Sequence, residues 1–428
     1  MARLKEYNGH YCESEYEYAF IGFLEAEGWK YSSGNNISRV TKRDVLIADD
    51  FKKFIADTNP DLTEDEVTKI YDNVRLVGAE SDFATLHKVY GWMVNGVQFT
   101  PQDELPRMIP LIDFDNWNKN IFRVVNQFTV EYTNNGQKEN RRPDVLLFVN
   151  GIPLCVIELK NPTDANATIY DAWEQINIRY WRDIPHLLHY CPLACISDGV
   201  KTRLGTVRTP YEHFYAWRRV NEGDAVSTLP FAETETMIKG VYSPERFLEI
   251  FRDYIYFQDS IYDSDEQEIV CRYPQFFATR LLKQSIIKSV VEKSGKGGTY
   301  FGATGCGKTY TMAFLARQLA LRCTDIPEIG SPTIILIVDR DELQKQGSKL
   351  FTKSKEFLNL GEVSVVKNRA QLRQELGARQ SGGFYICTIQ KFCDREDDKI
   401  GLINDRQNII CFSDEAHRTQ LEHSKKIQ

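Results

Sequence analysis

Residues 141–162 read RRPDVLLFVNGIPLCVIELKNP, and this stretch decides the fold of the first half of the chain. It contains two apolar runs, PDVLLFV and IPLCVIEL, which are separated by Asn150 and Gly151. Asn-Gly between two apolar runs is the strongest short signal for a β-hairpin. Short apolar runs without polar alternation are consistent with buried strands. The stretch therefore predicts two paired, buried strands.

Charged residues stand at the open end of this predicted hairpin. Asp144 opens the first strand, and Glu158 and Lys160 close the second. Because alternate residues of a strand share a face, Glu158 and Lys160 point the same way. Such a pair at a strand end usually faces solvent, but this one follows an apolar run, and buried charges need partners.

These charges can form a metal-dependent site. We expect Asp144 and Glu158 to hold Mg²⁺, because carboxylate oxygens are ligands that Mg²⁺ accepts. The carbonyl of Leu159 can supply a further ligand. Lys160 can then position the water that the metal activates.

Helical and strand patterns lie on both sides of the hairpin. Ser14 and Glu17 fit a capping box for a helix that ends near Gly28, and Thr63 is the expected N-cap of a second helix. The segment NIFRVVNQFTVEYT predicts one strand, and residues 243–257 predict one helix. The first half is therefore expected to be an α/β domain.

An acidic segment, QDSIYDSDEQEIV, separates the two halves of the chain. We place the boundary near residues 260–268, which gives domains 1–260 and 261–428. Beyond the boundary, short apolar strands alternate with helical patterns, and this alternation indicates a parallel sheet.

Residues 302–309 read GATGCGKT and match the phosphate-binding pattern G-x-x-x-x-G-K-[ST] in full. A short strand, GTYF, is predicted before the loop, and a helix, TYTMAFLARQLA, after it. In such a loop the backbone N–H groups and the helix N-terminus face phosphate oxygens. The lysine contacts the terminal phosphates of ATP, and the hydroxyl that follows it ligates Mg²⁺. The expected nucleotide-binding residues of the loop are Gly302, Thr304, Gly305, Gly307, Lys308 and Thr309.

The segment NIICFSDEAH supplies a partner motif for this loop. An apolar strand, residues 409–412, ends in Asp414 and Glu415. An α/β sheet places its chemistry at the carboxyl ends of its strands. We expect Asp414 to hold Mg²⁺ through its water shell and Glu415 to act as the general base.

GATGCGKT together with DEAH resembles the first motor lobe of superfamily 2 helicases and translocases, a RecA-like parallel-sheet ATPase. RYPQFFA resembles the adenine-reading motif of that family, which implies that Gln275 contacts adenine. VDRDELQKQ and CTIQKF resemble its two DNA-backbone motifs, which implies that Arg340, Gln344 and Thr388 lie near the DNA strand. No second motor lobe, with its arginine finger, follows DEAH, and we expect the chain to be a fragment of a longer protein.

The hairpin stretch resembles the PD-(D/E)xK nuclease motif, and closely resembles its form in the restriction (R) subunit of type I restriction–modification enzymes. The segments NQFTV, KNP, SDGVKTRLGT and YEHFYAWR fit the same family. The resemblance implies a nuclease domain with a mixed central sheet, in which Asp144, Glu158 and Lys160 are catalytic.

The same resemblance implies further site residues. The family's Gln-x-x-x-Tyr motif corresponds to Gln175 and Tyr180, with one extra residue between them. We expect Gln175 to be catalytic and Tyr180 to turn further around the helix. An acidic residue of the first helix, Glu17 or Glu15, completes the metal site unless both are capping charges.

The resemblance implies an ATP-dependent type I restriction endonuclease subunit that translocates duplex DNA and cleaves it with Mg²⁺. Its expected partners are double-stranded DNA and the separate methylation and specificity subunits. Two alternatives remain open. One is a nuclease-linked DNA helicase of repair or phage defence outside a methylation complex, and the other is a nucleotide-switched DNA-binding module with an inactive nuclease.

Composition limits the class of protein. The net charge of −7 means that any basic surface for DNA must be local. The ten cysteines form no CxxC pair, which favours reduced thiols over zinc sites or disulfides. No secretory leader and no membrane-length apolar stretch is found, so we expect a cytoplasmic protein.

Overall fold

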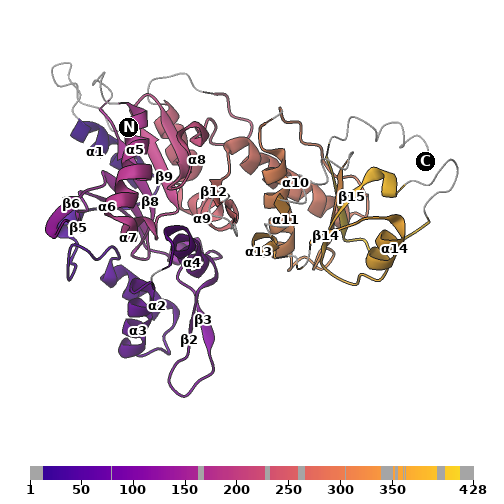
Figure 1. Cartoon of the computed structure of the whole chain (residues 1–428), viewed down its shortest axis with the longest axis horizontal. Helices are drawn as coiled ribbons and strands as arrows, with labels where there is room; N and C mark the ends of the chain where they lie inside the picture. Colours follow the sequence, from indigo (N-terminus) through magenta and orange to yellow (C-terminus); the bar gives the residue numbers. More distant parts are fainter. Residues whose placement is uncertain are drawn as a thin grey trace. The chain divides into compact units, whose positions relative to one another are not determined.

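The chain forms two compact units (Figure 1). The first unit comprises Met1–Ile255 and Gln267–Arg272, and the second comprises Tyr256–Glu266 and Tyr273–Gln428. The structure is a computed structural model. It describes residues 13–78, 80–161, 168–226, 232–258, 266–303, 305–338, 350–351, 355–359, 361, 363–392 and 401–414.

A mixed six-stranded sheet forms the centre of the first unit, in the order β1-β4-β7-β8-β9-β10. β1 runs parallel to β4, and β8 runs parallel to β9, whereas the other neighbours are antiparallel. A mixed sheet is what the family resemblance predicted. Its strands are β1 (Lys30–Ser33), β4 (Phe122–Asn126), β7 (Val145–Val149), β8 (Ile152–Leu159), β9 (Leu193–Ser197) and β10 (Thr202–Thr206).

The hairpin predicted from the sequence is confirmed as β7 and β8. Asn150 and Gly151 both adopt the left-handed backbone region, with φ angles of 52° and 76°, which is the conformation of a tight hairpin turn. Every residue of both strands is buried. The absence of polar alternation in the sequence is explained by this burial on both faces.

Helices pack against this sheet. α1 packs on β1, β4 and β8, and α5 packs on β8 and β9. The helices are α1 (Glu13–Ala26), α5 (Ile169–Glu174), a π-helical segment (Gln175–Tyr180), α6 (Trp181–Asp183), α7 (Pro185–Leu188), α8 (Ala232–Val241) and α9 (Pro244–Asp253).

Three sequence predictions in this unit are wrong in detail. The helix expected to follow Ser14 as its N-cap already begins at Glu13. The single strand predicted for NIFRVVNQFTVEYT is two strands, β4 and β5 (Val130–Asn134), because Gln127 adopts a φ of 56° that no extended strand accommodates. The helix predicted over residues 243–257 ends at Asp253, and the strand β11 (Ile255–Gln258) follows.

A helical region with two small hairpins completes the first unit. Thr63 caps α3 in a reciprocal capping box with Glu66, as predicted. In Figure 1 the β2–β3 hairpin extends away from the six-stranded sheet. The elements are α2 (Ala48–Thr58), α3 (Glu64–Arg75), α4 (Asp82–Asn95), β2 (Val97–Phe99), β3 (Arg107–Ile109), β6 (Gln137–Arg141), which pairs with β5, and β12 (Gln267–Val270).

The second unit contains a parallel four-stranded sheet in the order β14-β15-β13-β16, as its alternating pattern predicted. Its strands are β13 (Thr333–Val338), β14 (Val363–Val365), β15 (Phe384–Thr388) and β16 (Ile409–Ser413), and its helices are α10 (Tyr273–Val291), α11 (Lys308–Leu321), α13 (Lys355–Leu358) and α14 (Arg369–Gly377). Alternate residues of β13 belong to two apolar clusters, one with α11 and one with α14. Both faces of the sheet are therefore covered.

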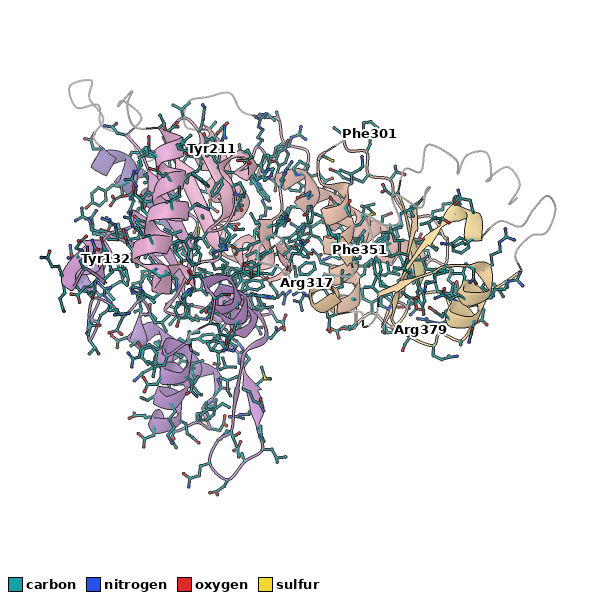
Figure 2. All side chains as sticks on the ribbon, in the orientation of Figure 1. Tyr132, Tyr211, Phe301, Arg317, Phe351 and Arg379 are labelled. Carbon is teal, nitrogen blue, oxygen red and sulfur yellow. The ribbon has the colours of Figure 1, made fainter. Side chains whose placement is uncertain are left out.

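One predicted strand of this unit is absent. The segment GTYF, directly before the phosphate-binding pattern, forms no strand. Phe301 is 95% exposed, and its side chain stands at the surface in Figure 2. The chain carries Gly295, Gly297 and Gly298 here, and glycine weakens a strand because it adds backbone entropy and offers no side chain to pack.

The eight cysteines in the described part of the chain are free. Among the helices that the structure describes, none combines the length and apolarity needed to cross a bilayer.

Candidate functional site

Asp144, Glu158 and Lys160 converge at the open end of the β7–β8 hairpin. Val145 pairs with Ile157, which brings Asp144 opposite Glu158. The backbone N–H of Leu159 donates a hydrogen bond of 2.8 Å to Oδ2 of Asp144. The Nζ atom of Lys160 lies 3.8 Å from Oε2 of Glu158. The structure therefore brings together the three residues that the sequence pattern singled out.

Glu158 is fully buried, and this burial shapes its chemistry. Its exposed fraction is 0%, and among the described residues its Oε2 atom has no hydrogen-bond partner. Burial raises the pKa of Glu158 well above its usual range, and the nearby Asp144 carboxyl raises it further, while the charge of Lys160 opposes both. A buried carboxylate with an oxygen that accepts no hydrogen bond, beside a second carboxylate, is a place where a cation lowers the energy.

A π-helical segment links the lysine and the glutamate. Lys160 Nζ donates to Oε1 of Gln175 at 3.0 Å, and Nε2 of Gln175 donates to the hydroxyl of Tyr180 at 2.8 Å. The Tyr180 hydroxyl then donates to Oε1 of Glu158. A directed chain of hydrogen bonds therefore runs from the ammonium to the carboxylate.

The expectation that Tyr180 turns away from Gln175 is wrong. In a π-helix, residues five apart come into register, whereas an α-helix brings residues four apart together. Gln175–Tyr180 is π-helical, so its extra residue restores the contact between its first and last side chains. Burial and the Glu158 charge raise the pKa of Tyr180 well above its usual value, which keeps its hydroxyl protonated as a donor.

Of the two acidic residues proposed from the first helix, Glu17 lies beside the site. It is 6% exposed and accepts a hydrogen bond of 2.5 Å from Nδ2 of Asn126. Burial raises the pKa of Glu17, and the charge of Asp144 adds to that increase. Asn126, which holds the Glu17 carboxylate, pairs across the sheet with Val145, the residue after Asp144. Glu15 is only half-buried.

Few groups at this site can ligate a metal ion. No group of three or more His, Cys, Asp or Glu side chains within the described ranges is arranged to hold a metal ion. Asp144 and Glu158 therefore offer two carboxylates, to which the Leu159 carbonyl can be added. The observation that fits a divalent cation here is Oε2 of Glu158, which accepts no hydrogen bond among the described residues.

The phosphate-binding pattern forms a loop at the start of α11. Gly305 and Gly307 adopt φ angles of 80° and 82°, and Lys308 is the first residue of the helix. The Nζ atom of Lys308 donates to the carbonyl of Gly302 at 3.1 Å, and Thr309 is half-buried in the first turn. The lysine thus folds over the loop that is expected to hold phosphate.

Gln275 reaches this loop from α10. It is 3% exposed, and its Nε2 atom donates to the carbonyl of Gly307 at 3.0 Å. Gly307 has a φ of 82°, which favours glycine, and a Cβ atom there would lie 2.5 Å from that nitrogen. The structure therefore joins the glutamine motif to the phosphate-binding pattern.

Two other predicted motor residues lie at the carboxyl edge of the parallel sheet. Thr388 is the last residue of β15 and is buried, and Asp414 directly follows β16. This edge is where parallel sheets place their chemistry. The predicted residues Thr304, Arg340, Gln344 and Glu415 lie outside the described residues.

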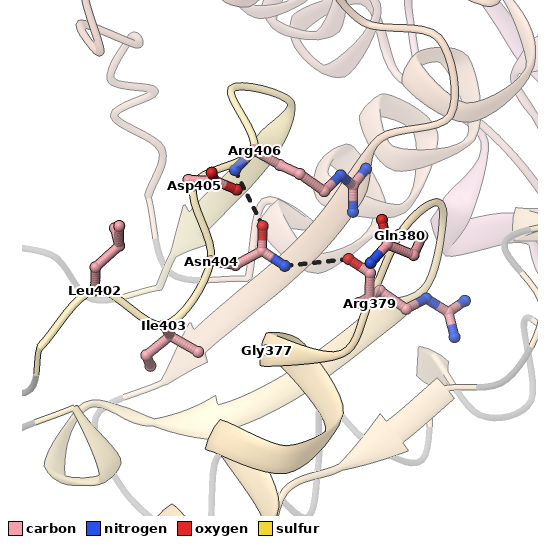
Figure 3. Close-up of a pocket in the computed structure, with 8 residues that line it drawn as sticks. All are labelled: Gly377, Arg379, Gln380, Leu402, Ile403, Asn404, Asp405 and Arg406. Carbon is pink, nitrogen blue, oxygen red and sulfur yellow. Dashed lines mark hydrogen bonds between the residues drawn. The ribbon is translucent and has the colours of Figure 1, made fainter.

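A pocket of about 240 Å³ lies at the other edge of the same sheet (Figure 3). Asn404 holds its two loops together, because its Nδ2 atom donates to the carbonyls of Leu376 and Arg379. Gln380 precedes β15 and Arg406 precedes β16, so the pocket adjoins the amino ends of these strands. It contains none of the residues predicted from the sequence.

Sequence reasoning missed a role for Asn126 and Gln127. Both contact the Glu17 carboxylate, although NQFTV was noted only as a family resemblance. The available signal was an asparagine at the end of the apolar run FRVV, because a polar side chain in a buried strand needs a partner.

Each half of the chain matches a known protein family. Residues 11–213 match the family described as the type I restriction enzyme R protein N terminus, and residues 274–427 match the family described as the SWI2/SNF2 ATPase.

Curated relatives extend this similarity over most of the chain. The type I restriction enzyme HindI endonuclease subunit of Haemophilus influenzae is 30% identical, in a match that covers 97% of this chain and 40% of the relative. A putative type I restriction enzyme endonuclease subunit, MjaIXP, of Methanocaldococcus jannaschii is 31% identical over 94% of this chain and 39% of the relative. The chain thus spans about 40% of the length of these relatives.

Proposed function

The chain belongs to the type I restriction enzyme R protein family, and from that premise we propose that its first unit cleaves duplex DNA with Mg²⁺ and that its second unit uses ATP to move the DNA. The single observation that supports the nuclease most directly is Glu158. It is buried, one of its oxygens accepts no hydrogen bond among the described residues, and it lies beside Asp144 and Lys160. An inactive remnant would have no reason to keep two carboxyls in this arrangement, since their repulsion costs stability.

The residues of the first unit divide the work of phosphodiester hydrolysis. Asp144 and Glu158 would hold Mg²⁺, which when bound lowers the pKa of a water molecule and neutralises phosphate charge. Lys160 positions the attacking water. Gln175 fixes the lysine ammonium, and Tyr180 fixes Oε1 of Glu158 so that Oε2 remains available.

Glu17 adds negative charge at the edge of this site. Its neighbour Tyr16 hydrogen-bonds to the Ser197 hydroxyl at 2.7 Å, and the Ser197 carbonyl accepts the backbone N–H of Lys160 at 2.8 Å. α1 is thereby anchored to the strand that adjoins the catalytic lysine. We assign Glu17 to the outer coordination sphere, where it orients water on the cation.

The second unit supplies the nucleotide site. Backbone N–H groups of the loop would bind phosphate, Lys308 the terminal phosphates and Gln275 the adenine, while Asp414 would hold Mg²⁺ and Glu415 would act as general base. The full set proposed for ATP and its Mg²⁺ is Gln275, Gly302, Thr304, Gly305, Gly307, Lys308, Thr309, Asp414 and Glu415.

The proposed partners are duplex DNA and the methylation and specificity subunits of a type I complex. The relatives are named as endonuclease subunits of type I restriction enzymes, which supports an assembly in which this chain contributes cutting and motion.

The proposal is tested in the full-length protein assembled with its methylation and specificity subunits. Plasmid cleavage and displacement of a DNA-bound triplex strand are measured with ATP and Mg²⁺ for wild type, Asp144→Asn and Lys308→Ala. We expect Asp144→Asn to displace the triplex without cutting, and Lys308→Ala to do neither. Wild-type cleavage by Asp144→Asn would refute the nuclease assignment. Cleavage that needs neither partner subunit would favour a nuclease-linked helicase outside a methylation complex.

A further inference from the structure

The turn between β4 and β5 carries two amide side chains that the proposed chemistry does not use. Asn126 ends β4 and is 1% exposed, and Gln127 follows it with a φ of 56°. A residue with a side chain adopts this left-handed region only at a cost in free energy. Both amides reach the same carboxylate, that of Glu17 on α1.

The orientation of the Asn126 amide follows from its partners. An ionised carboxylate only accepts hydrogen bonds, so the amide must present its Nδ2 atom to Glu17. The hydroxyl of Tyr31 donates to the other end of the amide, Oδ1, at 3.0 Å. Gln127 adds its Nε2 atom at 3.4 and 3.5 Å from the two Glu17 oxygens. The carboxylate is therefore held by donors.

The surrounding structure forces the turn into this shape. A Cβ atom on Gly34 would lie 2.6 Å from Cα of Phe128 and 2.8 Å from the Asn126 carbonyl, so the chain at Gly34 lies directly against the turn. The Arg39 guanidinium lies 3.8 Å from the centre of the Phe128 ring and donates to the Thr129 carbonyl at 2.9 Å. Glycine and arginine contacts thus fix the backbone from both sides.

We propose that Asn126 and Gln127 are positioning residues that hold the Glu17 carboxylate beside Asp144, where it acts as an outer ligand of a divalent cation. This inference rests on the proposed function, because it needs a cation at Asp144 and Glu158. Two carboxylates that lie close together repel each other. The hydrogen bonds from the two amides offset this repulsion between Glu17 and Asp144. The backbone strain at Gln127 is the cost of aiming its amide at α1.

The test measures cation binding without DNA. Mn²⁺ binding to the full chain is followed by calorimetry, and the unfolding temperature of the chelator-treated chain is measured in parallel. Asn126→Leu removes one amide and keeps the same number and branching of side-chain heavy atoms. Gln127→Gly removes the other and also suits the φ of 56°, so it should fold at least as well as wild type. Asn134→Leu is the matched control, because Asn134 makes the same amide contact to a carboxylate, Glu139, on the exposed β5–β6 hairpin.

We expect Mn²⁺ affinity to fall about tenfold in both Asn126→Leu and Gln127→Gly, within the range for residues that orient metal ligands. The unfolding temperature of metal-free Gln127→Gly should not fall, and Asn134→Leu should bind as wild type does. Wild-type affinity in Gln127→Gly, with binding lost in Asp144→Ala, overturns the inference and leaves the proposed function standing. Wild-type affinity in Asp144→Ala removes the cation site and the inference with it.

Discussion

The hydroxyl of Tyr180 donates a hydrogen bond to Oε1 of Glu158, a residue 22 positions earlier in the chain. The contact exists because the helix that carries Tyr180 widens into a π-helical turn between Gln175 and Tyr180. One oxygen of the buried carboxylate is thereby occupied, whereas the other accepts no hydrogen bond among the described residues and has only the ion-pair contact with Lys160 at 3.8 Å. The π-turn thus determines which oxygen of Glu158 is available.

Tyr180→Phe should reduce cleavage by about 10- to 100-fold, because it releases Oε1 of Glu158 and Nε2 of Gln175 from a shared partner. The measurement is the Mg²⁺ dependence of plasmid cleavage in the assembled complex. Tyr190→Phe is the control: Tyr190 is equally buried, but its hydroxyl donates to the Val74 carbonyl. A similar loss of cleavage in both variants would mean that Tyr180 supports only the fold.

Deletion of Ile178 should preserve much of the nuclease activity. Ile178 is 49% exposed within the π-turn, and its removal leaves Gln175 and Tyr180 four residues apart, the spacing that an α-helix brings together. Insertion of one alanine at the same place should abolish cleavage, because neither helix type then aligns the two side chains. Circular dichroism and cleavage are measured for both. Inactivity of the deletion with an intact fold would contradict this account of the π-turn.

Glu158→Gln should stabilise the metal-free chain above about pH 5 and abolish its stabilisation by Mg²⁺. The pKa of Glu158 is raised in the folded state from 4.5, so the folded chain holds the proton more strongly than the unfolded chain. The stronger proton binding therefore contributes fully to the stability of the folded chain below pH 4.5, and this stability is lost as the pH rises through the raised pKa. Glutamine carries no ionisable proton, so Glu158→Gln avoids this loss of stability. The unfolding temperature at pH 8 should rise by roughly 2–4 °C for each kcal/mol of stability regained.

Glu268→Gln is the control for this prediction. Glu268 is 3% exposed, and burial raises its pKa well above the usual range. Its replacement should raise the metal-free unfolding temperature in the same way, but the Mg²⁺-dependent increase should persist. Loss of that increase in Glu268→Gln would show that Mg²⁺ does not act through Glu158 specifically.

The sequence predicted the parts of the fold that local signals determine. Asn150-Gly151 specified a hairpin whose two strands carry Asp144 and Glu158 to one place, and Thr63 marked a helix start. These features depend on residues that are close in the chain. The convergence of the charged residues followed from hairpin register alone.

Features that depend on distant contacts could not be predicted in the same way. The break at Gln127 is imposed by Gly34 and Arg39, which are far away in sequence. The π-turn at Gln175 could not be predicted from a pattern that assumes α-helical spacing. GTYF has the residues of a strand but lies exposed among glycines. The choice between Glu17 and Glu15 depended on the burial of Glu17, which the sequence does not give.

Lys308→Ala should weaken ATP binding without destabilising the fold. Its Nζ atom donates to the Gly302 carbonyl, so the ammonium lies over the loop and outside the apolar clusters of the second unit. A hydrogen bond from a charged donor contributes about 1.5–3 kcal/mol, which corresponds to roughly a 10- to 100-fold loss of affinity. Binding of a fluorescent ATP analogue and the unfolding temperature are measured for this variant and for Lys296→Ala, which removes an exposed lysine shortly before the loop. Lys296→Ala should bind as wild type does, and equal affinity in the two variants would remove this lysine from the nucleotide site.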